Sequence, residues 1–401
     1  MPLSAKEIAD PRDRAVANRL ITTALRYHGP LGHLCGDLLE RGLPKKSGRF
    51  ESVLMLSLAQ LLFMPDLGDH SALFLAGEAM RSDKKSQHLV KLMNGVLREA
   101  QRRRDAVVLD ASTLLPAGLL KKWRQAYGSA AVEAFGQALI DGAALDLTLK
   151  AESASLIELL GAKPVLGDTV RVETRDSTID QLPGFAEGRF WVQDAAAAIP
   201  ARLFGLPAGA RVLDVGAAPG GKTAQLVKAG YAVTALERDA SRIERLRQNL
   251  KRLNYLAEVV TADALEYVPE KLFDGVLLDA PCSATGTFRR HPEVIWHRDA
   301  AGIDNRVRLQ RQLIERATAC LNPGGVLIYC VCSLETEEGE DQAAWASTQG
   351  LEVIPITAED LDGWAAPVTK DGFVRTHPGL RVPGENVGTL DGFFVARFRR
   401  R

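Results

Sequence analysis

The sequence predicts an α/β protein, in which a mostly parallel, doubly wound sheet follows an all-α helical bundle and a small mixed α/β connecting module. Three observations predict it. From residue 10 to about 105, apolar residues recur at spacings of three and four, and strand signals are nearly absent. After Leu145 the pattern changes to short β-type runs separated by turn residues. From about residue 186 apolar runs alternate with amphipathic stretches, which indicates parallel strands buried on both faces.

The length of 401 residues exceeds that of one typical domain. We expect a bundle of about five helices in residues 1–108, a connecting module in 109–185 and the α/β domain in 186–401. Asp10 and Pro11 predict where the bundle begins, because a capping carboxylate followed by proline at the first helical position favours a helix start.

In the α/β region we expect strands in "RVLDVGAA", "AVTALERD", "AEVVTAD", "FDGVLLDAP", "GGVLIYCVCSL" and "GFFVARFRR". Helices are expected in "GGKTAQLVKAG", "ASRIERLRQNLKRLN" and "AAGIDNRVRLQRQLIERATACL". In the connecting module, "ALDLTLK", "AKPVLG" and "DTVRVETRD" predict short strands.

Composition excludes several classes of protein. The formal net charge is zero, so the whole chain has no basic balance that would point to nucleic acid. Five cysteines are an odd number with scattered spacing, which fits neither a disulfide framework nor a zinc site, and we expect no metal. No apolar stretch reaches the length of a membrane span and no signal peptide opens the chain, so we expect a cytoplasmic protein.

A glycine-rich turn joins a strand to a helix in "VLDVGAAPGGKTAQL". Ligands of open α/β sheets bind at the carboxyl ends of strands, and glycine lets the backbone approach them closely. The spacing matches neither GxGxxG nor GxxxxGK[ST], so the loop alone is compatible with a dinucleotide, a nucleoside or a tight turn. The expected cofactor-binding residues of this loop are Gly216, Ala217, Ala218, Pro219, Gly220, Gly221 and Lys222.

Acidic residues lie at the ends of four successive predicted strands: Asp214, Glu237, Asp263 and Asp279. Each acidic residue alone is explained by a turn or a helix cap, but the four together favour a ligand-binding site at the ends of these strands. A carboxylate such as Glu237 can accept hydrogen bonds from ribose hydroxyls. We therefore expect a ligand with a ribose and a cationic or amino end, which S-adenosylmethionine fits, bound by Glu237, Asp263 and Asp279.

Four sequence blocks, "FAEGRFWVQDAAAAIPARLF", "VLDVGAAPGGKT", "LDAPCSATGTFRRHPEVIW" and "YCVCSLETEEGE", together resemble the Sun/RsmB (NOL/NOP/Sun) family of RNA 5-methylcytosine methyltransferases. The N-terminal "RAVANRLITTALR" and "LVKLMNGVLRE" resemble the NusB-like RNA-binding domain of the RsmB branch. The chain departs from the family pattern at Gly216, Glu237, Cys330 and Val331, and none of these departures removes a reacting group.

The resemblance implies a Rossmann-like class I methyltransferase fold with S-adenosylmethionine as cofactor. It implies a monomeric RNA (cytosine-5)-methyltransferase with RNA as partner, and 16S ribosomal RNA is the expected substrate. A tRNA cytosine-5 methyltransferase and a non-catalytic RNA-binding ribosome-assembly protein of the same fold are the alternatives. An enzyme that methylates an exocyclic amine is disfavoured, because the chain has Asp-Ala-Pro-Cys where such enzymes carry an acid or amide, two prolines and an aromatic residue.

Methylation at carbon 5 of cytosine explains why cysteines and an acidic residue occur in these motifs. Carbon 5 becomes nucleophilic after a thiolate adds to carbon 6. Asp279 is expected to hydrogen-bond ring nitrogen 3 or the amino group during this addition. Lys222 begins a helix, where a cation is otherwise unfavourable, so we expect it to contact Asp279 or substrate. Arg289, Arg290 and His291 are either holders of a substrate phosphate or parts of a solvated loop.

Two cysteines compete for the role of nucleophile, and their spacing leaves the choice open. In DNA cytosine methyltransferases the nucleophile lies in a "PC" motif, which here contains Cys282. The resemblance to the RNA family instead assigns the attack to Cys332 and assistance in product release to Cys282. We expect Cys35, Cys320 and Cys330 to be packed in the core, because free cysteine is among the most buried residues.

Overall fold

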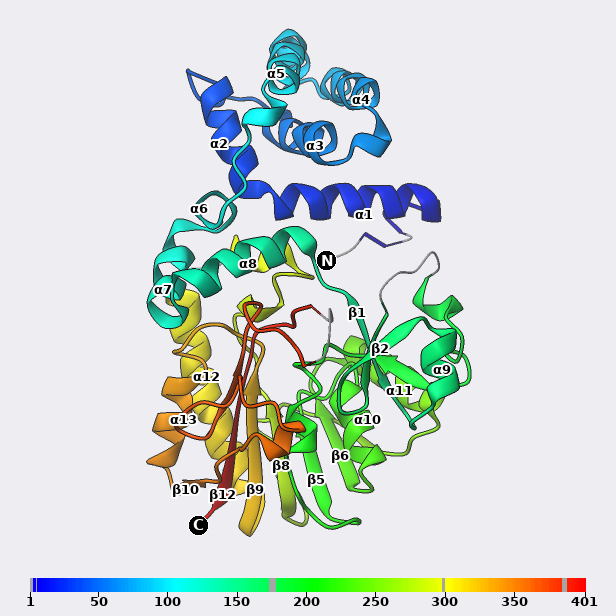
Figure 1. Cartoon of the computed structure of the whole chain (residues 1–401), viewed down its shortest axis with the longest axis vertical. Coiled ribbons are helices and arrows are strands. Elements are labelled where there is room, and N and C mark those ends of the chain that lie inside the picture. The colour runs from blue at the N-terminus through cyan, green and yellow to red at the C-terminus, as the bar shows by residue number, and fades with distance from the viewer. Residues whose placement is uncertain (1–2, 5, 173–177, 298–299, 384–387) are drawn as a thin grey trace. The chain divides into compact units, whose positions relative to one another are not determined.

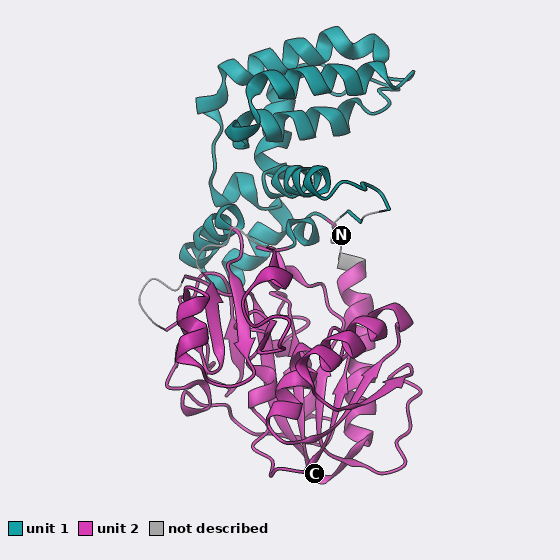
Figure 2. Cartoon of the chain, turned by 90° about the vertical axis from the view of Figure 1, so that its right-hand side faces the viewer, with its two compact units in different colours: residues 1–141, 291–296 teal, residues 142–290, 297–401 magenta. Residues whose placement is uncertain are grey.

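The chain divides into two compact units (Figure 2). One unit contains residues 1–141 with 291–296, and the other contains 142–290 with 297–401. The structure, a computed structural model, describes residues 3–4, 6–172, 178–297, 300–383 and 388–401. The division after residue 141 falls inside the segment 109–185, for which the sequence predicts a separate module. Within the described part of the chain, no helix is long and apolar enough to cross a membrane.

The first unit is helical, as predicted (Figure 1). Its helix α1 begins at Pro11, and the Asp10 carboxylate accepts hydrogen bonds from the backbone N–H groups of Arg12 at 2.7 Å and Asp13 at 3.1 Å, which confirms the predicted cap. The helices are α1 (Pro11–Arg26), α2 (His28–Leu38), α3 (Phe50–Phe63), α4 (Asp69–Arg81), α5 (Val90–Arg102), α6 (Ala111–Leu114), α7 (Ala117–Tyr127) and α8 (Ser129–Asp141).

Helix α3 lies at the centre of this unit. It packs against α1, α2, α4 and α5 and buries Leu54, Leu58 and Leu61, which accounts for its nearly continuous apolar sequence. The helix ends at Phe63, just before Pro65, which cannot continue it. The segment 291–296 belongs to the same unit: the Trp296 indole N–H donates to the Leu25 carbonyl at 3.0 Å.

The second unit contains a small antiparallel sheet of order β2-β3-β1-β4. Its strands are β1 (Leu145–Leu149), β2 (Ala162–Leu166), β3 (Thr169–Val172) and β4 (Phe190–Val192), and helix α9 (Ala154–Leu159) packs on it. The first three strands confirm the predicted β-type runs, although the end of "DTVRVETRD" lies outside the described residues. Strand β4 was not predicted, because three residues are too short to show a period.

The main sheet has the order β10-β12-β9-β8-β5-β6-β7, with β11 paired to β12. Strands β5 to β9 are mutually parallel where they pair, and β12 lies antiparallel to β9. The predicted mostly parallel sheet is thus confirmed. Its strands are β5 (Arg211–Val215), β6 (Ala232–Glu237), β7 (Glu258–Thr261), β8 (Phe273–Asp279), β9 (Leu321–Val331), β10 (Leu351–Val353), β11 (Val374–Thr376) and β12 (Phe393–Arg400).

Helices cover both faces of the main sheet (Figure 1). Alternate strand residues divide the core: Val212 and Val233 pack with Leu226 of α10, whereas Leu213 and Leu236 pack with Ile314 of α12. Residues from α11 extend the first layer and residues from α13 the second. The helices are α10 (Gly221–Lys228), α11 (Ala240–Leu253), α12 (Ala300–Ala319) and α13 (Glu340–Ser347).

The strand order reverses direction between β5 and β8, and such a switch point opens a crevice at the carboxyl ends of the strands. Gly216 follows β5 there with φ of 78°, and a Cβ atom at this position would lie 2.8 Å from the carbonyl oxygen of Asp279. Only glycine satisfies both conditions. The chain therefore turns closely past the end of β8, and this turn forms the floor of the site described next.

Candidate active site

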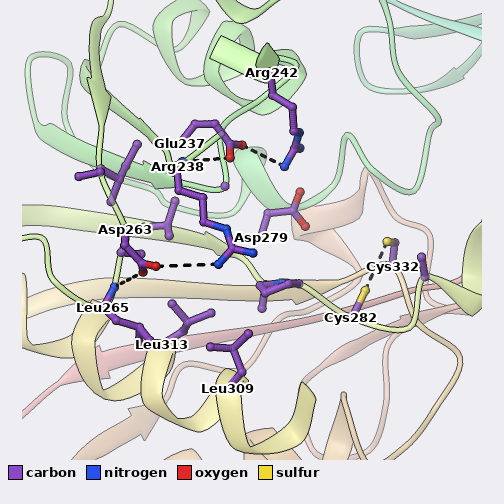
Figure 3. Close-up of a pocket in the computed structure, with 18 residues that line it drawn as sticks. Glu237, Arg238, Arg242, Asp263, Leu265, Asp279, Cys282, Leu309, Leu313 and Cys332 are labelled. Carbon is purple, nitrogen blue, oxygen red and sulfur yellow. Dashed lines mark hydrogen bonds and ion pairs between the residues drawn. The ribbon is translucent and has the colours of Figure 1, made fainter. Parts of the chain in front are cut away.

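A cavity of about 290 Å³ lies at the carboxyl ends of β5, β6 and β8 (Figure 3). Six of the predicted site residues line it together: Gly216, Glu237, Asp263, Asp279, Cys282 and Cys332. The other lining residues are Val215, Leu236, Arg238, Arg242, Ala262, Ala264, Leu265, Ala280, Pro281, Ala284, Leu309 and Leu313. The structure thus brings residues from six separate sequence segments into one pocket.

Glu237 ends β6 and is almost fully buried, with a side chain only 4% exposed. Its Oε1 atom accepts hydrogen bonds from the backbone N–H groups of Arg238 at 3.0 Å and Asp239 at 3.1 Å. Its Oε2 atom lies 3.0 Å from Arg242 Nη1 but accepts no hydrogen bond from the described residues. A buried acceptor without a donor is rare, so the site lacks a hydrogen-bond donor that a ribose hydroxyl would supply.

Leu265, Leu309 and Leu313 form an apolar wall of the cavity, on the side opposite Glu237 in Figure 3. Asp263 lies beside it and accepts from the backbone N–H of Leu265 at 2.9 Å. An adenine ring fits between apolar side chains, and the buried acid fits a ribose, so the cavity fits S-adenosylmethionine. Sequence reasoning missed Leu309 and Leu313, because apolar residues of an amphipathic helix cannot be told from core residues by their period.

We predict that Glu237→Gln weakens cofactor binding about 10- to 100-fold, because a hydrogen bond to a charged group contributes about 1.5–3 kcal/mol. Isothermal titration of the full chain with S-adenosylhomocysteine measures this change. Glu266→Gln is the control, since Glu266 is exposed and does not line the cavity. Unchanged affinity in Glu237→Gln would remove Glu237 from the binding site.

Lys222 reaches the end of β8, where its Nζ atom lies 2.8 Å from Asp279 Oδ2. Burial by itself would lower the pKa of Lys222, but the charge and hydrogen bond of Asp279, together with the influence of Cys330 and Asp214, outweigh burial and raise that pKa. The predicted contact between Lys222 and Asp279 is therefore present. Asp279 also lines a second cavity of about 190 Å³, together with Lys222, Arg290 and the predicted loop residues Gly216, Ala217, Ala218, Pro219 and Gly221; Gly220 lines neither cavity.

Asp214 lies in β5 and is fully buried below the glycine-rich turn. Its Oδ2 atom accepts from the Thr223 hydroxyl at 2.6 Å, and its Oδ1 atom has no hydrogen-bond partner among the described residues. Burial raises the pKa of Asp214 from 3.8 to about 6. Asp214 lines the second cavity rather than the first.

The raised pKa of Asp214 predicts a pH-dependent stability. Between about pH 4 and about pH 6 the folded chain keeps the Asp214 proton while the unfolded chain loses it, so the free energy of unfolding falls as pH rises through this window. Asparagine has no such proton. As pH rises from 4 to 7, the free energy of unfolding of Asp214→Asn is expected to increase by on the order of 3 kcal/mol relative to that of the unaltered chain.

Urea unfolding at the two pH values measures this difference, and any constant effect of the amide cancels in it. Asp304→Asn, at an exposed position, is the control. A difference between Asp214→Asn and the unaltered chain that does not change with pH would contradict the prediction.

The sulfur atoms of Cys282 and Cys332 lie 3.5 Å apart and point toward one another (Figure 3). The hydrogen bond between Cys282 and Cys332 raises the pKa of Cys282 well above its usual range, and burial raises it further. Both thiols are half-buried, whereas Cys320 and Cys330 are buried as predicted, and Cys35 is half-buried against the helical core.

Comparisons with known proteins show which family the chain is similar to. Residues 203–399 match the family of 16S rRNA methyltransferases RsmB/F, and residues 3–102 match the NusB family. The ribosomal RNA small subunit methyltransferase B of Xanthomonas campestris pv. campestris is 36% identical over 97% of this chain and 89% of its own length. The chain belongs to the RsmB/F family.

Solved structures show the same fold. The protein PH0851 superposes with a TM-score of 0.78 over 98% of this chain and 92% of its own, at 21% identity. NSun6 from Pyrococcus horikoshii, solved with SFG, gives a TM-score of 0.60 over 73% of this chain and 99% of its own, at 19% identity. The predicted Rossmann-like methyltransferase fold with a NusB-like first region is therefore confirmed.

In this RsmB/F chain the two arginines after the "PC" motif differ in their surroundings. Arg289 is buried, and its guanidinium hydrogen-bonds Asp194 at 3.0 Å and Asp391 at 2.9 Å, so it does not reach a substrate phosphate. Arg290 also pairs with Asp391 but lines the second cavity, where it remains a candidate phosphate contact. His291 is exposed and lies 3.4 Å from Glu293.

Sequence reasoning also missed Glu338, a buried carboxylate that hydrogen-bonds the residues after both cysteines. The segment "SLETEEGE" contains four acidic residues between Ser333 and Glu340, and no period or spacing distinguishes one of them.

Proposed function

We propose that this chain is an S-adenosylmethionine-dependent RNA methyltransferase that methylates carbon 5 of a cytosine in 16S ribosomal RNA. One observation carries the proposal. Two thiols 3.5 Å apart share a cavity with the cofactor carboxylate Glu237 and with Asp279. Methylation of an amine has no use for a thiol, whereas methylation of carbon 5 needs one. The enzyme is expected to act as a monomer in the cytoplasm, where ribosomal RNA is assembled into ribosomes.

When bound, S-adenosylmethionine supplies an electrophilic methyl group. Cys332, as thiolate, bonds to carbon 6 of the cytosine and makes carbon 5 nucleophilic. Asp279 hydrogen-bonds a base protonated at nitrogen 3, and its negative charge stabilises this form, which accepts the thiolate more readily. The base must leave its stack, or be single-stranded, to reach these groups.

Cys282 is expected to act after methyl transfer. The hydrogen bond and the charge of Cys332 contribute to the raised pKa of Cys282 in the free protein. A Cys332 that is bonded to carbon 6 supplies neither influence, so the pKa of Cys282 falls at this stage. Its thiolate then accepts the proton from carbon 5, the carbon–sulfur bond breaks, and Cys332 leaves as thiolate with the product restored to an aromatic ring.

We predict that Cys282→Ala accumulates a covalent complex with RNA, because attack and methyl transfer proceed while release is slowed. A labelled 16S RNA fragment that stays bound to the protein on a denaturing gel measures it. Cys320→Ala, a buried thiol outside the cavity, is the control and should show no complex. If Cys332→Ala accumulates the complex instead, the two roles are reversed.

The function is tested with the full chain, unmodified 16S ribosomal RNA and a cofactor carrying a labelled methyl group. After digestion to nucleosides, the label should appear in 5-methylcytidine. Unmodified tRNA in a parallel reaction decides between the two substrate classes. Label in a methylated amine, or no label with either RNA, would contradict the proposal. Bisulfite mapping of 16S ribosomal RNA from a strain without the gene then identifies the target nucleotide.

A further inference from the structure

Each of the two cavity cysteines is followed by a serine, and both serines hydrogen-bond the same carboxylate, that of Glu338. The backbone N–H of Ser283, next to Cys282, donates to Glu338 Oε1 at 2.9 Å and to Oε2 at 3.0 Å. The hydroxyl of Ser333, next to Cys332, donates to Oε2 at 2.6 Å. The two serine oxygens also lie 2.9 Å from one another. One side chain thus links the loop after β8 to the loop after β9.

Further contacts fix this carboxylate in place. Gln310 of α12 donates to Glu338 Oε1 at 3.2 Å and to the carbonyl of Pro281 at 3.0 Å, directly before Cys282. The Tyr329 hydroxyl donates to the Glu338 carbonyl at 2.6 Å. Glu338, Gln310 and Tyr329 are all 0% exposed. The carboxylate therefore holds both loops with bonds that are shielded from water.

Burial of a carboxylate costs several kcal/mol of desolvation, and an apolar core stabilises a fold at least as well. A buried carboxylate with this many donors is therefore explained better by the geometry that it imposes than by a contribution to the stability of the fold. That geometry concerns the thiols, because each loop has one bonded serine and one cysteine next to it. The Sγ atoms of Cys282 and Cys332 do not lie on a common element, so no single strand or helix fixes the 3.5 Å between them.

We propose that Glu338 is a positioning residue for the reaction: it holds the Cys282 and Cys332 thiols at the separation that lets one attack the base while the other waits to accept the proton. The part that concerns RNA rests on the proposed function. The part that concerns the distance between the thiols does not, and the two are tested by different measurements.

Glu338→Gln tests the proposal with little change in volume. An amide offers one acceptor oxygen instead of two, and its NH₂ group opposes the donors that face it. The loops are then no longer held together by a single group. In the free protein, diamide oxidises the two thiols to a disulfide and is itself reduced to the hydrazine, so its rate reports how often the sulfurs meet. We expect Cys282–Cys332 disulfide formation to slow about tenfold, since reactions between held groups depend steeply on geometry.

Mass spectrometry of the cross-linked peptides measures the rate and separates this pair from the other three cysteines. The same variant should show a lower single-turnover rate of methyl transfer with an unchanged KM for cofactor, because Glu338 does not line the cofactor cavity. Glu352→Gln, an exposed acid of β10, is the matched control and should keep both rates. A merely structural role would lower thermal stability without a selective loss of disulfide formation.

If Glu338→Gln fails to fold, Ser283→Ala and Ser333→Ala replace it, because each removes a hydroxyl that donates to Glu338 Oε2 and leaves the carboxylate in place. Both should slow disulfide formation by a few-fold. Wild-type disulfide rates in the folded variants would overturn the proposal. A wild-type chain that methylates no RNA would instead overturn the proposed function, and the disulfide measurement would still decide the role of Glu338.

Discussion

Replacing Cys332 by alanine is expected to abolish turnover, with kcat lowered by about 10⁵-fold, since removal of the nucleophile of a covalent mechanism costs this much or more. Carbon 5 of cytosine does not attack a methyl sulfonium unless a nucleophile has first added to carbon 6. Without Cys332 the neighbouring Cys282 is not expected to substitute, because in the proposed mechanism its sulfur is placed to accept the proton from carbon 5 and not to attack carbon 6. Single-turnover transfer of a labelled methyl group to 16S ribosomal RNA measures the loss.

The same variant should bind S-adenosylhomocysteine with an affinity within about twofold of the unaltered chain, because alanine removes the reacting atom and none of the cofactor acids. It should also form no covalent RNA complex. Cys320→Ala is the control for loss of a thiol elsewhere in the sheet domain. Turnover by Cys332→Ala above a hundredth of the unaltered rate would exclude Cys332 as the nucleophile.

The mostly parallel character of the main sheet could be predicted because apolar strands alternate with amphipathic helices along the chain. Strands β4, β10 and β11 could not, since each has three residues and gains its pairing only from tertiary contacts. The segment 291–296 belongs to the helical unit although the sequence expects it in the sheet domain. Nothing in its composition signals this, because the contact of Trp296 with Leu25 joins residues far apart in the sequence.

Some residues of the candidate site could likewise be predicted from the sequence, and others could not. Acids at strand ends, such as Glu237 and Asp279, could be predicted because parallel strands bring their carboxyl ends to one edge. Glu338 could not, because its partners follow strands β8 and β9 and meet only in the folded chain. The two cysteines are a third case. Neither spacing nor the 3.5 Å between their sulfur atoms decides which one attacks, and the assignment to Cys332 depends on the resemblance to the family.

Asp279→Asn is expected to lower kcat by about 10³-fold, the upper range for loss of one preorganised electrostatic contact. An amide carries no negative charge, so it does not stabilise a base protonated at nitrogen 3. It also removes the partner of Lys222, whose ammonium lies 2.8 Å from the Asp279 carboxylate and is largely buried. The variant therefore loses rate for two reasons, which a second substitution separates.

Lys222→Met in the Asp279→Asn background removes the unpaired cation while leaving the base without its carboxylate. If the loss of rate comes from the base, the double variant should stay about 10³-fold slow while its thermal stability recovers. If rate recovers together with stability, Asp279 acts by holding Lys222 and not by contacting cytosine. Single-turnover rates, the affinity for S-adenosylhomocysteine and thermal unfolding of both variants distinguish these outcomes, with Asp304→Asn as the exposed control. The double variant thus tests whether Asp279, which ends β8, contacts the cytosine or holds Lys222 in place.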